Sequence, residues 1–134
     1  MTIPGIIIQD SPYSVKETID LIQTAITSHG GTIYARINQQ TELRLVGQEL
    51  LPLEYLLFGN PKAGGLIMAA NPVAALDLPL KVIAWEDAKH QVRVAFNEAT
   101  YIEIRYSLPP ATAALTELTA MVAKALAPAK PLRS

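Results

Sequence analysis

The chain has no cysteine, only two histidines and few charged residues. Without cysteine, the protein cannot form disulfides, thiolate nucleophiles or cysteine-based zinc sites. The chain has 11 Lys and Arg residues and 12 Asp and Glu residues, and the basic residues do not form a run. This balance argues against a nucleic-acid partner, because neutralisation of phosphates supplies most of that affinity. No apolar stretch approaches the roughly 20 residues that span a bilayer, so we expect no membrane partner.

Enzyme signatures are also absent. His29 and His90 are far apart in the sequence, so a histidine metal site is not expected. The serines lie in turn, cap or helix-end contexts and not in a Gly-x-Ser-x-Gly elbow. Glu86 and Asp87 are neighbours on an expected strand, where their side chains would point to opposite faces. The sequence therefore predicts no catalytic residues, no metal and no cofactor.

Length and composition predict one domain over residues 1–134, with 128–134 as a frayed tail. The segment Met1–Gly5 lacks the basic region of a signal peptide, which leads us to expect a cytoplasmic protein. Half of the residues are hydrophobic and only 17% are charged. Such a surface is explained either by burial between the two copies of a symmetric homodimer or by an alanine-rich core.

Hydrophobic periodicity predicts a mixture of strands and helices. Ser14 and Glu17 have the spacing of a capping box ahead of an apolar stripe that ends at Gly30. Residues 100–108 fit both a strand and a helix, and propensity alone favours the strand. Asn71 and Pro72 are expected to open a further short helix. Strands are predicted over 6–8, 32–37, 53–58, 80–86 and 91–97, the last two as a hairpin, and helices over 14–29, 40–50, 66–70 and 109–127.

The stretch from Phe58 to Gly65 is predicted to be a loop at the end of a strand, because it contains Asn60-Pro61 and two glycines. It is not a phosphate-binding P-loop, since Gly65-Leu66 stands where Lys and Ser or Thr are required. Lys62 and the amides after it could hold an anion. Alternatively, the glycines and the proline only shape a turn.

Three segments together resemble the domain of unknown function 302 family over about residues 14–108: Phe58–Met68, Ala75–Leu80 and Trp85–Asp87. The resemblance implies an α+β fold in which a curved antiparallel sheet is backed by helices, in a TATA-binding-protein-like arrangement. It also implies a homodimer and a helix over 100–108. The chain departs from the family pattern at Gln39 and Tyr106, where members often carry His, and at 65–68, where a Gly-Thr-Pro-Leu-Met run is usual.

The leading hypothesis is a non-enzymatic, homodimeric domain that binds a small ligand, such as a small anion, or a partner. One alternative is an enzyme for a small anionic metabolite, with Lys62 holding the anion and Asp77 or Glu86 as base. Another is a purely structural dimer. Trp85, Met68 and Tyr55 could line an apolar pocket, or belong to the core or an interface. The candidate ligand-binding residues are Asn60, Lys62, Gly64, Gly65, Met68, Asp77 and Trp85.

Overall fold

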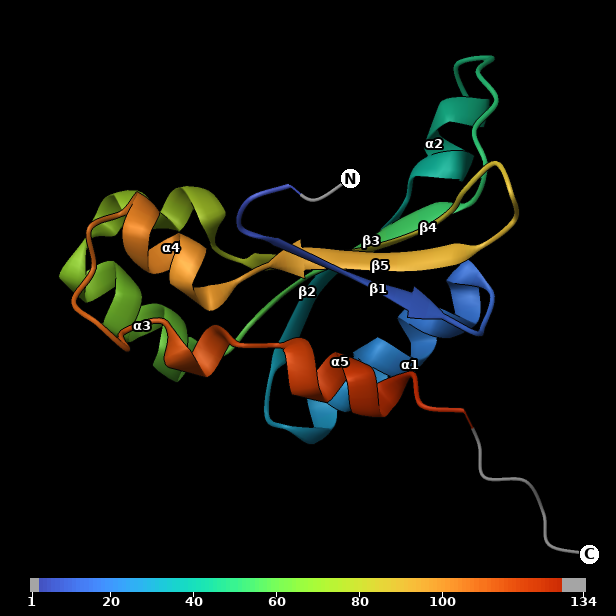
Figure 1. Cartoon of the computed structure of the whole chain (residues 1–134). Coiled ribbons are helices and arrows are strands. Elements are labelled where there is room, and N and C mark those ends of the chain that lie inside the picture. The colour runs from blue at the N-terminus through green and yellow to red at the C-terminus, as the bar shows by residue number, and fades with distance from the viewer. Residues whose placement is uncertain (1–2, 129–134) are drawn as a thin grey trace, which may run out of the picture.

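Five strands form one open antiparallel sheet (Figure 1). The computed structural model describes residues 3–128, so most of the predicted tail lies outside the described residues. The order across the sheet is β1-β5-β4-β3-β2, and every neighbouring pair is antiparallel. The strands are β1 (Ile6–Ser11), β2 (Thr32–Asn38), β3 (Leu53–Gly59), β4 (Leu80–Glu86) and β5 (Val92–Asn97).

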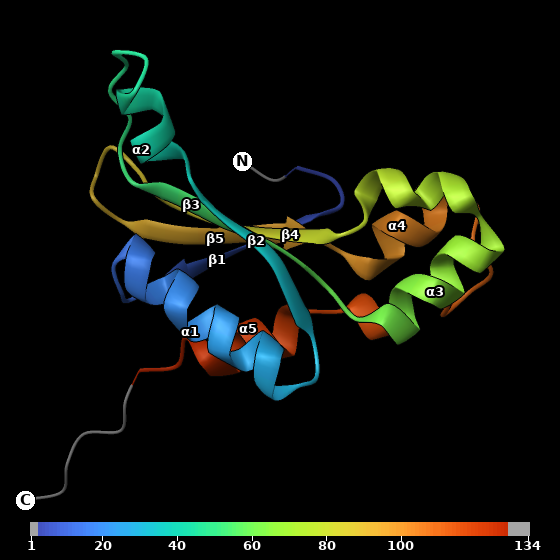
Figure 2. The same ribbon diagram turned by 180° about the vertical axis from the view of Figure 1, so that it is seen from behind.

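Two helices, α1 (Val15–Ser28) and α5 (Thr119–Ala125), pack on one face of the sheet, as both views show (Figures 1 and 2). Alternate residues of β4 and β5 point into the layer between the sheet and these helices. Ile19 and Ile22 of α1 have no exposed surface, and each such burial contributes about 2 kcal/mol. The main core contains Val15, Ile19, Ile22, Ile26, Leu56, Phe58, Val82, Ala84, Val92, Val94, Phe96, Leu118, Val122 and Leu126.

The other helices lie at the two ends of the sheet (Figure 2). At one end, α3 (Pro61–Ala70), the 3-10 helix η1 (Pro72–Asp77) and α4 (Ala99–Arg105) surround a second, smaller core. We call these three elements the lobe; the short η2 (Ala114–Thr116) joins their core to α5. At the opposite end, α2 (Gln39–Arg44) and the connection to β3 project from the sheet. We call residues 39–52 the arm.

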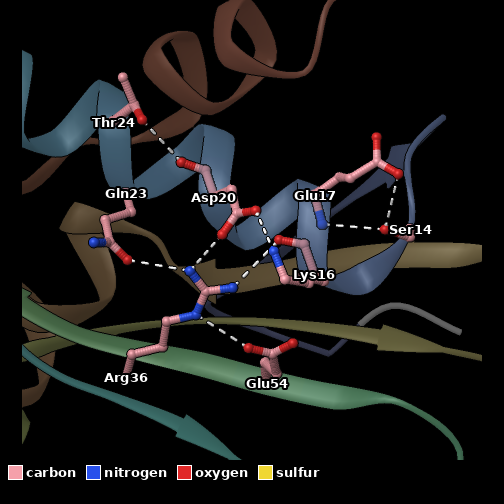
Figure 3. A network of polar contacts seen from close by, with 8 residues as sticks. All are labelled: Ser14, Lys16, Glu17, Asp20, Gln23, Thr24, Arg36 and Glu54. Atoms are coloured by element: carbon pink, nitrogen blue, oxygen red, sulfur yellow. Dashed lines mark hydrogen bonds and ion pairs between the residues drawn. The ribbon is translucent and has the colours of Figure 1, made fainter.

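A β-bulge in β2 brings a charged side chain to the helix-covered face. The register shifts between Ile33 and Ala35, so Arg36 lies on the same face as Ile33, whereas the two would face opposite sides of a regular strand. Arg36 Nη1 donates to Asp20 Oδ1 at 2.6 Å, and its Nε donates to Glu54 Oε1 at 3.1 Å (Figure 3). One guanidinium thereby connects α1, β2 and β3.

Most of the predicted elements are confirmed. The α+β fold, the five strands and the hairpin have the expected positions, and Ser14 accepts the Glu17 amide at 3.1 Å as the cap of α1. The helix implied by the resemblance at 100–108 is also confirmed, as α4. Among residues 3–128, we find no helix with the length and apolar character needed to cross a bilayer.

Three element predictions are wrong. Residues 61–65 are not a loop but the first half of α3. The last helix does not open at Pro109, because Ala111 has φ of 64° and cannot be part of a right-handed helix; α5 begins only at Thr119. The helix predicted over 40–50 ends at Arg44, ahead of Gly47 with φ of 78°.

Candidate functional site

A pocket of about 360 Å³ opens where the sheet meets the lobe. The C-terminus of α1, the adjoining ends of β2 and β3, the N-terminus of α3 and the segment from η2 to α5 surround it. It therefore lies at the junction of the two cores. Its apolar wall consists of Ile26, Phe58, Pro61, Ala63, Met68, Leu78, Pro79, Leu80, Leu118 and Met121.

The local sequence explains why the chain turns at this point. Gly59 ends β3, and a Cβ there would lie 3.3 Å from the Tyr34 ring, so a larger residue would crowd the pocket wall. Asn60 then caps α3, since its Oδ1 accepts the Lys62 amide at 3.0 Å. Pro61 occupies the first helical position, where its missing N–H is not needed. These residues start a helix immediately after the strand.

The polar groups of the pocket are few. Tyr34 is 56% exposed, and His29 Nδ1 lies 2.8 Å from the Ala25 carbonyl. Thr116 is buried and donates to the Ala113 carbonyl. Hydrogen bonds from the Thr119 hydroxyl and amide lower the pKa of Glu117, which keeps this carboxyl group charged. Among residues 3–128, the lining thus includes one carboxylate and no Lys or Arg.

Three of the predicted site residues line this pocket. Asn60 is the N-cap of α3, and Gly64 and Met68 follow it on the helix at intervals of four residues. Lys62 and Gly65 lie on the same helix, but both are exposed and neither is among the residues that line the pocket. Gly64 donates its amide to the Asn60 carbonyl at 2.8 Å. The predicted anion site required free backbone amides in a loop. In the structure these residues are helical, and the Gly64 amide is used in a hydrogen bond of the helix.

The other two predicted residues lie elsewhere. Asp77 accepts hydrogen bonds from the Tyr106 hydroxyl and, at 3.1 Å, from Arg105 Nη1, so it joins η1 to α4 inside the lobe. The hydrogen bond to Asp77 raises the pKa of the Tyr106 phenol. Trp85 lies on the face of the sheet opposite to α1, with Leu53 and Arg93 as its strand neighbours. The structure does not bring these two residues to the pocket, and ligand binding by any of the seven stays a prediction.

Sequence reasoning did not identify four polar residues of the pocket. His29, Tyr34, Thr116 and Glu117 come from three separate parts of the chain. The His29-Gly30-Gly31 ending of α1 marked a turn, but nothing in the sequence pairs it with the segment before α5. Only the packing of α1 against α5 brings them together.

The match to a family model decides the family. The model of the domain of unknown function DUF302 matches residues 7–126, which is most of the chain. The chain belongs to the DUF302 family. A crystal structure of an uncharacterized conserved DUF302 protein from Bacillus stearothermophilus has a TM-score of 0.77 at 16% sequence identity. That similarity covers 92% of this chain and 97% of the Bacillus chain, and it supports the fold.

Two longer relatives of this DUF302 chain are named as ion channels. The fluoride-specific ion channels FluC 1 of Brucella suis biovar 1 (strain 1330) and Brucella abortus biovar 1 (strain 9-941) are each 32% identical over 104 residues. The match covers 78% of this chain, but only 41% and 38% of the two Brucella proteins. The chain thus spans about two-fifths of the length of these relatives.

Both positions where this DUF302 chain departs from the family's histidines are engaged in local contacts. Gln39 Nε2 donates to the Tyr55 hydroxyl at 3.0 Å at the base of the arm. Tyr106 donates to Asp77 inside the lobe. The two positions lie at opposite ends of the sheet, so within one copy they do not form a common site.

Proposed function

We propose that this DUF302 chain is a non-enzymatic domain that binds a small, mainly apolar molecule in the pocket at the N-terminus of α3. The observation that carries the proposal is the pocket itself, since about 360 Å³ of apolar-walled space is within the size range of small-molecule sites. Filling it would remove the exposed Met68 and the half-buried Leu80 from water. The apolar surface so buried would supply most of the binding free energy.

The ligand we propose is uncharged or positively charged. Glu117 is the one Asp or Glu among the lining residues, and its lowered pKa keeps it ionised at neutral pH. This carboxylate disfavours an anion in the pocket, but only modestly, because Glu117 is exposed and water weakens the repulsion between like charges. The Asn60 side chain and the Thr116 hydroxyl supply polar contacts for an alcohol, amide or amine.

The alternative, an enzyme for a small anionic metabolite, has weaker support. Lys62 lies outside the pocket lining and is exposed. The two bases considered for it are already engaged, Asp77 by Tyr106 and Arg105, and Glu86 by His90 at 2.9 Å. We propose no channel activity, because the named channels extend far beyond the matched segment. We place the binding role in the cytoplasm, as the sequence predicts, and fractionation of producing cells tests that location.

Two dyes of similar size and different charge test the proposal. We expect the neutral dye N-phenylnaphthylamine to bind one site with enhanced fluorescence, and the sulfonate dye anilinonaphthalene sulfonate to bind more weakly. The measurement is fluorescence titration of the purified chain. Tighter binding of the sulfonate dye, lost in the Lys62→Ala variant, would instead support the anion alternative.

Two glycine variants locate the dye. Gly64→Leu places a branched side chain in the pocket, and its first carbon fits, since a Cβ there would lie 3.7 Å from Met68 Cε. We expect at least a tenfold loss of neutral-dye affinity, about 1.4 kcal/mol. Gly65→Leu is the control: it is the next residue of α3, and a Cβ there has no contact within 4 Å. If both variants bind as the wild type does, the dye does not occupy this pocket and the proposal fails.

A further inference from the structure

One face of the sheet has no helix across its centre. Within residues 3–128, α1 and α5 pack on the opposite face, whereas the arm and the lobe lie at the two ends (Figures 1 and 2). The strand register identifies the side chains of the open face, because the neighbours of buried Val82 and Ala84 point away from the core. They include Ile37, Tyr55, Leu57, Ile83, Trp85 and Ala95.

The open face is apolar, and its charges are balanced locally. Lys81 Nζ lies 4.6 Å above the centre of the Tyr55 ring. Arg93 pairs with Asp87 at 3.3 Å and with Asp10 at 3.4 Å. Since no charge of one sign dominates, a second copy of this face can approach it without like-charge repulsion. A strongly charged partner, by contrast, would gain no electrostatic attraction from this face.

Exposed apolar side chains also occur on the two elements at the ends of the face. At the tip of the arm, Leu45 and Val46 are 77% and 70% exposed. On the lobe, Leu76 of η1 and Ile104 of α4 are 76% and 81% exposed. Contiguous exposed apolar side chains mark interaction surfaces.

We propose that this face is the interface of a two-fold homodimer in which the arm of each copy contacts the lobe of the other. A two-fold axis that lies in the interface and crosses the sheet midway between arm and lobe exchanges the two ends. Each arm then meets the partner's lobe, and every contact occurs twice. The proposal goes beyond ligand binding in the pocket and does not depend on it.

The available area is sufficient for a stable dimer. Five strands about 4.8 Å apart and six residues long, at about 3.4 Å each, give a face of roughly 500 Å². The arm and lobe contacts add to this and bring the total toward the roughly 800 Å² per partner of a standard interface. The low share of charged residues, 17%, is consistent with a surface partly buried between copies.

Light scattering coupled to gel filtration tests the proposal on the full chain. We expect the wild type to have twice the chain mass of 14.5 kDa. Ile83→Lys, at the centre of the face, should lower the mass to 14.5 kDa, as should the double variant Leu45→Ser with Val46→Ser. The arm residues are so exposed that the double variant keeps its fold even if Ile83→Lys does not. Leu66→Ser is the control, since Leu66 is 59% exposed on α3 but lies outside the open face.

Cross-linking tests the arrangement, because the chain has no native cysteine. Leu45→Cys combined with Ile104→Cys should give a disulfide-linked dimer on mild oxidation, and Leu45→Cys alone should not. Three results would overturn the proposal: a monomeric wild type at all concentrations, a dimer that both face variants leave intact, or efficient linkage by Leu45→Cys alone. A monomeric wild type would mean that the face binds a different partner, and linkage by Leu45→Cys alone would mean that the two arms contact each other.

Discussion

At the residue scale, Arg36 has the largest role in joining the layers. Its guanidinium donates to Asp20, Glu54 and Gln23 and to the carbonyl of Lys16 (Figure 3). Of the buried polar residues in the described part of the chain, Glu54 is the charged one, at 9% exposure. A buried carboxylate without a partner is costly, so this pair is required by the fold even though it lies outside the proposed pocket.

Arg36→Met should therefore destabilise the protein by about 2 kcal/mol or more, since it leaves the Glu54 carboxylate without its hydrogen-bond donor. Urea unfolding followed by circular dichroism measures the change. The matched control is Arg44→Met, because Arg44 and Glu49 are 3.9 Å apart and 56% and 87% exposed. That substitution should change stability by less than about 0.5 kcal/mol. Equal losses in the two variants would contradict the role given to Arg36.

The lowered pKa of Asp20 predicts how the stability of the protein depends on pH. Hydrogen bonds from Arg36 and Lys16 lower its pKa below the ordinary value of 3.8. A carboxyl group whose pKa is lower in the folded state stabilises the fold above its unfolded pKa, and this contribution disappears as pH falls through the folded pKa. The stability difference between wild type and Asp20→Asn should thus be constant from about pH 7 to about pH 5 and shrink below about pH 4. A pH-independent difference would contradict this.

At the element scale, α3 is where prediction from the sequence failed. Asn-Pro and two glycines indicated a loop. In the structure the same asparagine is a helix cap, the proline occupies the first turn, and the glycines have ordinary helical dihedrals. Propensity disfavours glycine in a helix by about 1 kcal/mol. The burial of Ala63 and Ile67 against the rest of the protein compensates for this cost.

Glycine-to-alanine variants test this account of α3. Gly65→Ala should stabilise the protein by about 0.5 to 1 kcal/mol, because the position is helical and a Cβ there meets no atom within 4 Å. Thermal unfolding reports the change. Gly47→Ala, in the arm, should instead destabilise by about 1 kcal/mol, since its φ of 78° is unfavourable for alanine. If Gly65→Ala is destabilising, these residues are not in a helix.

Elements with strong local signals were predicted correctly. The apolar stripe of α1 and the alternating arms of the hairpin repeat over enough residues to identify both type and position. Residues 100–108 fit two periods, and the helix there was implied by the family resemblance and not by the pattern. The late start of α5 has no such signal, because it depends on the left-handed conformation of Ala111.

At the scale of the whole molecule, the pocket and the open face both arise from how the elements pack. The pocket combines the end of α1, the start of α3 and the segment before α5. The open face exists because α1 and α5 both pack on the same side of the sheet. Three of the seven candidate residues reached the pocket because they are close together on α3. Asp77 and Trp85 did not, because Asp77 bonds to α4 inside the lobe and Trp85 lies on the open face of the sheet.

The sequence by itself determined the strands, the capped first helix, the hairpin and the family, because these depend on periodicity and on contacts between residues close in the chain. It also determined that catalytic and metal-binding signatures are lacking. Only the tertiary structure decided that residues 61–70 are helical, which residues surround the pocket, and which face of the sheet stays open. The physical reason is that these features depend on burial between segments distant in the chain, and such burial outweighs local preferences of about 1 kcal/mol per residue.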